Sequence, residues 1–144
     1  MNTTKNLFEI AQKTILAESQ AIAKLTEYIN DDFIKAIEAI YNCKGRLIVT
    51  GIGKSAIIAQ KIVATMNSTG TPALFLHASE AIHGDLGMVQ ADDIIICISK
   101  SGNSPEIKVL VPLLKRFGNT LIGMTADLNS FLGKESHYVL HAHV

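Results

Sequence analysis

Three short polar stretches of this 144-residue sequence carry the residue types that most readily bind ligands or transfer protons. They are 51–55 (GIGKS), 77–85 (HASEAIHGD) and 99–104 (SKSGNS). The third combines three serines with a glycine and an asparagine before Pro105, a residue well placed as the first of a helix. Backbone N–H groups and small hydroxyls at a helix start bind phosphate without net positive charge. The stretch therefore predicts a phosphate site, and its hydroxyls favour a phosphorylated sugar over a purine nucleotide.

Helix capping explains only part of this third stretch. Ser104 is expected to cap the helix that begins at Pro105. Capping does not account for Ser99, Ser101 and Gly102, so the phosphate-binding interpretation stands beside it.

The stretch at 51–55 is similar to two nucleotide-binding motifs and satisfies neither. A Walker A loop requires glycine where this sequence has Ile48, and a dinucleotide fingerprint requires an acid near the end of the second strand, where 75–77 reads FLH. The plainest alternative is a tight turn from strand to helix. Lys54 weakens that alternative, because an exposed cation in a first helical turn opposes the helix dipole at a cost of about 0.3–1 kcal/mol. We therefore expect Lys54 to have a function.

Glu106 and two histidines are further candidates for proton transfer. Glu106 lies in the first turn of its helix, where an acid ordinarily just complements the dipole. A general base beside a bound sugar is the alternative, less favoured on position alone. His77 and His83 are six residues apart, and two histidines do not supply the three or four ligands of a metal site. Acid–base work at the rim of a site stays open for His83.

An alternation of strands and helices must position these stretches. Short apolar runs at 47–50, 73–76, 94–98 and 120–124 predict buried strands, with helices over 54–68 and 105–117 and a fifth strand at 137–144. The predicted fold is α/β, with three layers and a five-stranded parallel sheet of flavodoxin-like order flanked by helices. Because ligands bind beyond the carboxyl ends of such strands, the three polar stretches are expected to share one rim.

One domain is expected over residues 1–144, with N-terminal helices within 5–42 and an α/β core over 46–144. Two features fit this scheme less well. Pro112 lies inside the predicted helix 105–117 and should kink or restart it. The fifth strand ends the sequence, so nothing remains to cover it, and a domain truncated at its C-terminus is expected.

Composition excludes several classes of protein. Thirteen basic and thirteen acidic side chains give zero formal net charge, which argues against nucleic acid or an acidic membrane as a partner. A hydrophobic content of 48% excludes disorder, and the sequence has no apolar run long enough for a spanning helix and no signal peptide. Cys43 and Cys97 are too few for a disulfide scaffold and fit a reducing cytoplasm.

Four motifs in the expected order resemble the sugar isomerase (SIS) domain. They are GIGKS at 51–55, STGTP at 68–72, AIHGDLGM at 81–88 and ISKSGNSPEI at 98–107. The third resembles, more narrowly, the KpsF/GutQ group of arabinose-5-phosphate isomerases. The resemblance implies a cytoplasmic homo-oligomer, a dimer or tetramer, that interconverts D-ribulose 5-phosphate and D-arabinose 5-phosphate. The product would feed synthesis of Kdo for lipopolysaccharide or capsule, with no required cofactor.

Carried over by motif, the resemblance implies a role for each site residue. Glu106 would be the base or proton shuttle, Lys54 would polarise the carbonyl oxygen, and His83 would assist ring opening or proton transfer between oxygens, from a neighbouring subunit. His77 matches a histidine that binds an inhibitory divalent metal such as zinc. The residues implied in substrate binding are Gly53, Ser55, Gly70, Thr71, Ser99, Ser101, Gly102, Asn103 and Ser104.

The sequence also departs from the family. Its members continue with a helical segment that carries another important Glu and a further His, and many then add a pair of CBS domains; these 144 residues contain neither. Two alternatives therefore stay open beside the isomerase. One is a non-catalytic SIS module that binds phosphosugars, and the other is a different SIS sugar-phosphate isomerase.

Overall fold

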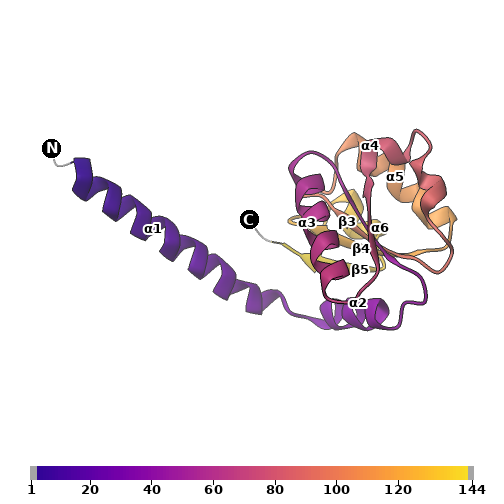
Figure 1. Cartoon of the computed structure of the whole chain (residues 1–144), viewed down its shortest axis with the longest axis horizontal. Coiled ribbons are helices and arrows are strands. Elements are labelled where there is room, and N and C mark those ends of the chain that lie inside the picture. Colours follow the sequence, from indigo (N-terminus) through magenta and orange to yellow (C-terminus); the bar gives the residue numbers. More distant parts are fainter. Residues whose placement is uncertain (1–2, 143–144) are drawn as a thin grey trace.

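Five parallel strands form one sheet at the centre of the domain (Figure 1). The computed structural model describes residues 3–142, with side chains from residue 6 onward. The spatial order is β2-β1-β3-β4-β5, which confirms the predicted flavodoxin-like order. The strands are β1 (Leu47–Gly51), β2 (Ala73–His77), β3 (Ile94–Ile98), β4 (Thr120–Thr125) and β5 (Tyr138–His141).

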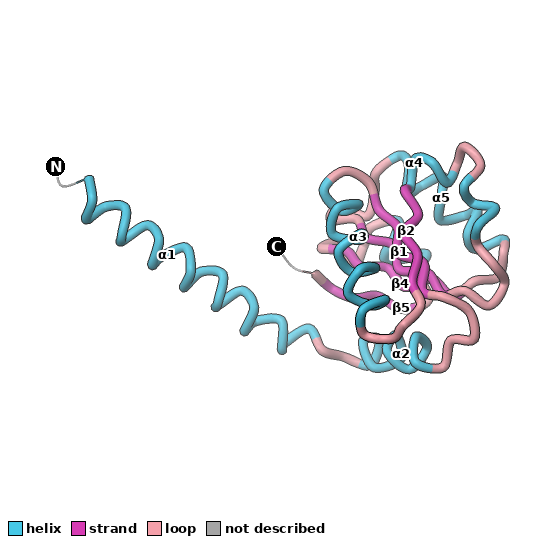
Figure 2. The backbone as a smooth tube through the Cα atoms, viewed as in Figure 1, coloured by secondary structure: helices cyan, strands magenta, loops and turns pink. Residues whose placement is uncertain are grey.

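Helices cover both faces of the sheet and make the three predicted layers (Figure 2). Val49 of β1 packs in the cluster that contains Ala36 and Ala59, from the helices of one face. Ile48, its neighbour along the strand, packs in the opposite cluster with Ile107. This alternation buries β1 on both sides. One layer holds α2 (Asp31–Tyr41) and α3 (Lys54–Ser68), and the other holds α4 (Ala78–Ala81), α5 (Pro105–Arg116) and α6 (Phe131–Glu135).

The predicted restart at Pro112 does not occur, and α5 is continuous across it. The missing N–H of a proline leaves the carbonyl four residues earlier without its helical partner, which here is the carbonyl of Lys108. Both residues are exposed, so water can satisfy that carbonyl. The buried face of the helix, with Leu110 and Leu114, stays intact.

The expectation of an uncovered fifth strand was wrong for one face of β5, although all four of its residues are only half-buried. The cover comes from upstream, because α2 packs on β5. The backbone N–H of Val139 donates to the Asp32 carboxylate at 3.0 Å, and the rings of Tyr28 and His141 lie edge to face, 4.6 Å apart. The described strand ends at His141, and residues 143–144 of the predicted strand lie outside the described residues.

The chain begins with a long helix, α1 (Thr3–Lys24), that extends away from the sheet (Figure 1). A 3₁₀ turn, η1 (Leu25–Tyr28), follows Lys24 and separates the N-terminal helices expected within 5–42. Asn30 caps α2, since its side chain accepts a hydrogen bond from the Phe33 N–H. None of the helices in residues 3–142 is long and apolar enough to cross a membrane.

Candidate active site

The three polar stretches do follow the carboxyl ends of neighbouring strands. In the strand register, Gly51 at the end of β1 lies opposite His77 of β2 and Ile98 of β3. The residues directly after these positions begin the three loops. The structure therefore brings the loops of Lys54, His83 and Ser99 to one edge of the sheet, which we call the carboxyl edge.

The turn after β1 presents Lys54 on a glycine-dependent backbone. Gly53 has φ 57° and ψ −128°, a conformation essentially reserved for glycine. A Cβ on Gly51 would lie 3.0 Å from the backbone of Ser55, so the end of β1 and the start of α3 pack closely against each other. Lys54 opens α3 with its side chain exposed, and Ser55 is half-buried beside it. The turn can therefore offer an ammonium group to a ligand above the sheet.

The serine loop, residues 99–104, is folded by its own side chains. The hydroxyl of buried Ser99 accepts a hydrogen bond from the Gly102 N–H at 3.2 Å. The exposed Ser101 hydroxyl accepts one from the Asn103 N–H at 3.3 Å, and the Asn103 amide donates back to the Ser101 carbonyl at 3.0 Å. Ser99 and Asn103, predicted to bind substrate, thus make contacts that shape the loop.

A second segment, residues 125–132 from the end of β4 to the start of α6, makes hydrogen bonds to the serine loop. The Phe131 N–H donates to the Asn103 side-chain oxygen at 3.0 Å, and the Leu132 N–H donates to the Gly102 carbonyl at 2.9 Å. The Thr125 hydroxyl donates to the Lys100 carbonyl at 3.1 Å. Gly102 is buried with φ +61°, and a Cβ there would lie 2.6 Å from the Cβ of Ser130. Sequence reasoning missed this contribution; Ser130, a helix-capping residue type before 131–135, was the available signal.

Ser104 has the backbone of a helix N-cap, but its hydroxyl does not cap. Its φ of −62° and ψ of 148° are those of a capping residue, yet the side chain accepts no N–H of α5. The Ser104 Oγ is buried and has no hydrogen-bond partner among the described residues. The capping prediction was therefore wrong. A buried hydroxyl without a partner is costly, and here it leaves a donor at the start of α5 for an anion.

Thr50 is a second polar residue near this edge, and sequence reasoning missed it. It lies one residue before the end of β1, is fully buried, and its hydroxyl has no partner within residues 3–142. Cys97 lies opposite it in the sheet. Burial raises the pKa of the Cys97 thiol to about 12, so this group stays neutral and is not a nucleophile at physiological pH.

Glu106 and His83 both reach the carboxyl edge from helical segments. Glu106 is half-buried in the first turn of α5, two residues after Ser104. His83 is exposed in the turn after α4, where its N–H donates to the Glu80 carbonyl. The backbone thus holds Glu106 firmly at the serine loop, while the His83 side chain faces outward.

His77 does not have the surroundings of a metal site. Its Nδ1 accepts a hydrogen bond from the Ser79 N–H at 3.3 Å, and its ring lies edge to face with Phe75. Among the described residues, no three His, Cys, Asp or Glu side chains gather closely enough to hold a metal ion. The donors that surround His77 in residues 3–142 therefore do not fit a zinc ion by themselves.

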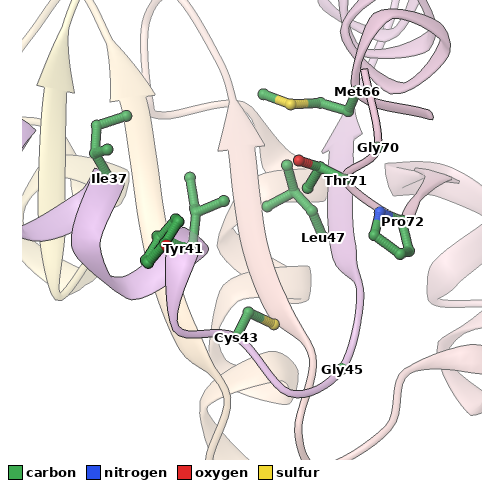
Figure 3. A pocket seen from close by; sticks show the side chains of 10 residues that line it. Ile37, Tyr41, Cys43, Gly45, Leu47, Met66, Gly70, Thr71 and Pro72 are labelled. Atoms are coloured by element: carbon green, nitrogen blue, oxygen red, sulfur yellow. The ribbon is translucent and has the colours of Figure 1, made fainter. Parts of the chain in front are cut away.

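Gly70 and Thr71 lie at the opposite edge of the sheet, away from the other predicted substrate ligands. They precede the first residue of β2, and the adjoining Pro72 carbonyl accepts from the N–H of Leu47, the first residue of β1. Figure 3 shows both residues beside a cavity of about 450 Å³ between α2 and α3, at the amino ends of the strands. Since strand direction separates the two edges, this chain cannot bring Gly70 and Thr71 to its own Lys54.

The Asp93 carboxylate and the Asn119 side-chain NH₂ group at this amino edge are hydrogen-bonded within the chain. Asp93, 2% exposed, accepts the Arg46 guanidinium at 2.8 Å and the backbone N–H groups of Arg46 and Gln90, each at 2.8 Å. Burial acts to raise the pKa of this carboxyl, but these hydrogen bonds outweigh it and hold the pKa below its ordinary value. The Asn119 amide donates to the Gln90 and Asp93 carbonyls, both at 2.8 Å.

The fold and the loops agree with a match to a known family. The model of the SIS domain matches residues 39–144, so the chain belongs to the SIS domain family. Among curated relatives, it is 47% identical to the arabinose 5-phosphate isomerase KdsD of Pseudomonas aeruginosa, over 100% of this chain and 45% of that protein. It is 50% identical to KdsD of Yersinia pestis, over 88% of this chain and 39% of that protein. The chain thus spans less than half of these relatives.

A solved structure supports the same assignment. An Escherichia coli CFT073 protein in complex with arabinose 5-phosphate is 39% identical, with a TM-score of 0.90 over 98% of this chain and 74% of that one. The sugar isomerase domain of an RpiR transcription factor from Sphaerobacter thermophilus is 19% identical, with a TM-score of 0.71 over 91% of this chain and 75% of that one. The second likeness concerns the fold alone.

Proposed function

We propose that this chain carries the phosphosugar site of an aldose–ketose isomerase that interconverts D-ribulose 5-phosphate and D-arabinose 5-phosphate. The observation that carries the proposal is the unpartnered, buried Ser104 hydroxyl at the start of α5, two residues from Glu106. An anion site at this hydroxyl would share one helical turn with the Glu106 carboxylate. Relatives named arabinose 5-phosphate isomerase support this substrate, as does the complex of the similar E. coli protein with arabinose 5-phosphate.

The reaction needs a base, a cation and an anchor. Conversion of the ketose to the aldose removes a proton from C1, passes through an enediolate and returns a proton to C2. Glu106 would take and return that proton. Lys54 would stabilise the negative oxygen of the enediolate, where a fixed cation lowers the barrier most. His83 would assist ring opening or move a proton between the two oxygens, from a neighbouring subunit.

The serine loop would anchor the phosphate. The Ser101 and Ser104 hydroxyls and the N–H groups at the start of α5 would donate to it. Within the loop the Ser101 hydroxyl only accepts a hydrogen bond, from the Asn103 N–H at 3.3 Å, and the Ser104 hydroxyl has no partner among the described residues. Ser99, Gly102 and Asn103 would act by holding the loop in shape. Gly53 and Ser55 would let the sugar approach the Lys54 turn. Such an anchor fixes the reacting carbons beside Glu106 and so lowers the entropic part of the barrier.

No cofactor enters this proposal, and zinc would act only as an inhibitor through His77 with ligands from elsewhere. We also propose that the protein works in the cytoplasm as a homo-oligomer, a dimer or tetramer, and supplies Kdo synthesis for lipopolysaccharide or capsule. The KdsD names of the relatives support that pathway. Treatment with a chelator is expected to leave isomerisation unchanged.

The decisive experiment follows ¹³C-labelled ribulose 5-phosphate by NMR, with thermal shifts for pentose and hexose phosphates measured alongside. We expect formation of arabinose 5-phosphate, and Glu106→Gln is expected to reduce turnover by about 10²–10⁴-fold while the thermal shift with arabinose 5-phosphate persists. Asp31→Asn is the matched control, since it removes a first-turn acid from α2, away from the site. Full activity in a folded Glu106→Gln protein would refute the role of Glu106.

Two other functions predict different outcomes in the same experiment. A phosphosugar-binding module would show thermal shifts with pentose phosphates but form no product. A different sugar-phosphate isomerase would shift and convert only other substrates, such as hexose phosphates. The fold is shared with a transcription-factor domain, so architecture does not separate these functions, whereas the pairing of Lys54 with Glu106 favours the enzyme.

A further inference from the structure

Two hydroxyl groups at the carboxyl edge are buried without hydrogen bonds, and the proposed reaction uses only one of them. The Ser104 hydroxyl is part of the proposed phosphate anchor, whereas Thr50 has no part in it. Thr50 is 0% exposed, and its Oγ1 has no partner among the residues that the structure describes. A buried hydroxyl without a partner lowers stability, so folding alone explains neither group.

The Thr50 side chain faces the helical layer that contains α5. Successive side chains of a strand point to opposite faces of the sheet, so Thr50 lies on the same face as Ile48. Ile48 packs in the core cluster that contains Ile107 of α5. Cys97, which lies opposite Thr50 in the register of β1 and β3, belongs to the same cluster. The Thr50 hydroxyl is therefore a polar group at the carboxyl end of an apolar core.

The Ser104 side chain reaches the same core from the helix. The buried residues of α5 recur at helical spacing and face the sheet, and the first of them is Ile107. Ser104 lies three residues before Ile107, and residues three apart share one face of a helix, so its buried hydroxyl continues this apolar stripe toward the carboxyl edge. Thr50 and Ser104 thus lie at the same end of one core cluster, one on the sheet and one on the helix that covers it.

We propose that Thr50 is a positioning residue that orients the Ser104 hydroxyl toward the phosphate of the substrate. When a phosphosugar binds, the Thr50 O–H donates to the Ser104 Oγ, and the Ser104 O–H donates to the phosphate. A serine hydroxyl has a single proton and two acceptor sites, so a donor on its inner side turns that proton outward. Hydrogen bonds in such a chain polarise one another, and a bond to an ionised phosphate is among the strongest.

This inference rests on the proposed phosphosugar site and adds a residue behind it. Neither hydroxyl has a partner within residues 3–142, so the bond between them forms together with the bond to the phosphate. The alternative role for Thr50 is packing alone. Valine has the same branched shape without the hydroxyl, so exchange of Thr50 for valine separates the two roles.

Calorimetric titration of the full chain with arabinose 5-phosphate tests the proposal. Thr50→Val should raise the Kd about 5–20-fold, because the Ser104 hydroxyl loses the donor that orients it. KM should rise by a similar factor, while kcat changes less than about twofold, since Thr50 acts on the anchor and not on the reacting carbons. The melting temperature of the ligand-free variant should stay the same or rise by a few degrees, because an unpaired buried hydroxyl is removed. A purely structural role would not weaken binding in a protein that is equally or more stable.

Three further variants serve as controls. Thr50→Ser keeps the hydroxyl and should bind within about threefold of the wild-type chain. Ser104→Ala should weaken binding by itself, and Thr50→Val added to it should change the Kd less than about twofold, because Thr50 acts through Ser104. Thr120→Val makes the same exchange at the half-buried first residue of β4, at the amino edge, and should leave the Kd unchanged.

The outcomes separate this inference from the proposed function. Wild-type affinity in Thr50→Val would overturn the role of Thr50 while the phosphate site stands, as would an equal loss of affinity with and without the Ser104 hydroxyl. A strongly destabilised Thr50→Val protein would also overturn it, because Thr50 would then be structural. A wild-type chain that binds no arabinose 5-phosphate would refute the site and this inference together. The Kd does not depend on turnover, so binding without conversion would refute the isomerase alone.

Discussion

The two edges of the sheet differ in how far their polar side chains are hydrogen-bonded within the chain. At the amino edge, the Asp93 carboxylate accepts hydrogen bonds from Arg46 and Gln90, and the Asn119 amide donates to two carbonyls. At the carboxyl edge, Lys54 and His83 are exposed, and the Ser104 hydroxyl has no partner within residues 3–142. The hydrogen bonds at the amino edge connect the segments that precede β1, β3 and β4. The polar groups at the carboxyl edge remain available to a ligand.

This contrast suggests a division of roles, with the amino edge important for stability and the carboxyl edge for the proposed function. A buried carboxylate with several hydrogen bonds stabilises a fold only while all its partners are present. A buried hydroxyl without a partner lowers stability until something binds it. Asn119 is a partial exception at the amino edge, since its side-chain oxygen has no partner in the described part of the chain. Variants at the two edges should therefore affect different measurements.

Among the variants that compare the two edges, Lys54→Met at the carboxyl edge is expected to have the largest effect. If Lys54 stabilises the enediolate as proposed, loss of this cation should lower kcat by about 10²–10³-fold. The free energy of unfolding should stay the same or rise by a few tenths of a kcal/mol, because an unfavourable charge leaves the start of α3. Steady-state kinetics and urea unfolding check both expectations. Lys61→Met, in the same helix, is the matched control and should leave kcat unchanged.

The reverse pattern is expected from Asp93→Asn at the amino edge. The amide would place an NH₂ group against N–H donors, which should lower the free energy of unfolding by about 3 kcal/mol. Binding of arabinose 5-phosphate to the folded protein should be unchanged. Urea unfolding and calorimetric titration measure the two quantities, with the exposed neighbour Asp92→Asn as the control. A large loss of affinity without loss of stability would contradict the division between the edges.

Gly102→Ala tests whether the conformation of the serine loop depends on its contacts with residues 125–132. The new methyl group would collide with Ser130 at a backbone φ of +61°, which should lower stability by about 1–3 kcal/mol and raise KM. Gly53→Ala is the comparison, because its φ of +57° is also strained but a Cβ there has nothing within 4 Å. We expect the smaller stability loss at Gly53. Equal losses at both positions would show that backbone strain alone matters.

The smallest effect is a dependence of stability on acid pH. The pKa of Asp93 is lower in the folded chain than its unfolded value of about 3.9, so its contribution is present above that value and is lost as pH falls through the folded pKa. Urea unfolding at pH 7, 5 and 3 should show the wild-type chain losing its advantage over Asp93→Asn mainly below about pH 4. A constant difference between the two proteins across this range would contradict the assignment.

Local pattern predicted the scaffold well. The run at 94–98 became β3 and the helix predicted over 54–68 became α3, because a continuous apolar stretch and a 3.6-residue period each allow one buried arrangement. Strand alternation also placed Lys54, His83, Glu106 and the serine loop at one edge. Short elements such as α6 were missed, since five residues carry too little periodicity to be seen.

Contacts between distant segments were beyond the sequence. The Asn103 side chain accepts a hydrogen bond from the Phe131 N–H, 28 residues away. The motif did not predict this contact, because serine and asparagine in such a loop suggest ligand binding. The same holds for Gly70 and Thr71, whose motif suggested substrate but whose position before β2 puts them at the other edge. In both cases the residue type suggested ligand binding, but only the tertiary structure showed which groups surround the residue.

The sequence by itself determined the class of fold, the edge of the sheet where the three polar loops lie and the residue types gathered there. These follow from local periodicity and from parallel strand direction. Only the tertiary structure decided that α2 covers β5, that the loop after β4 clamps the serine loop, and that α1 extends away from the domain as an arm. Those facts depend on which segments meet after the chain folds back on itself. Burial energy depends on that meeting and not on the order of residues along the chain.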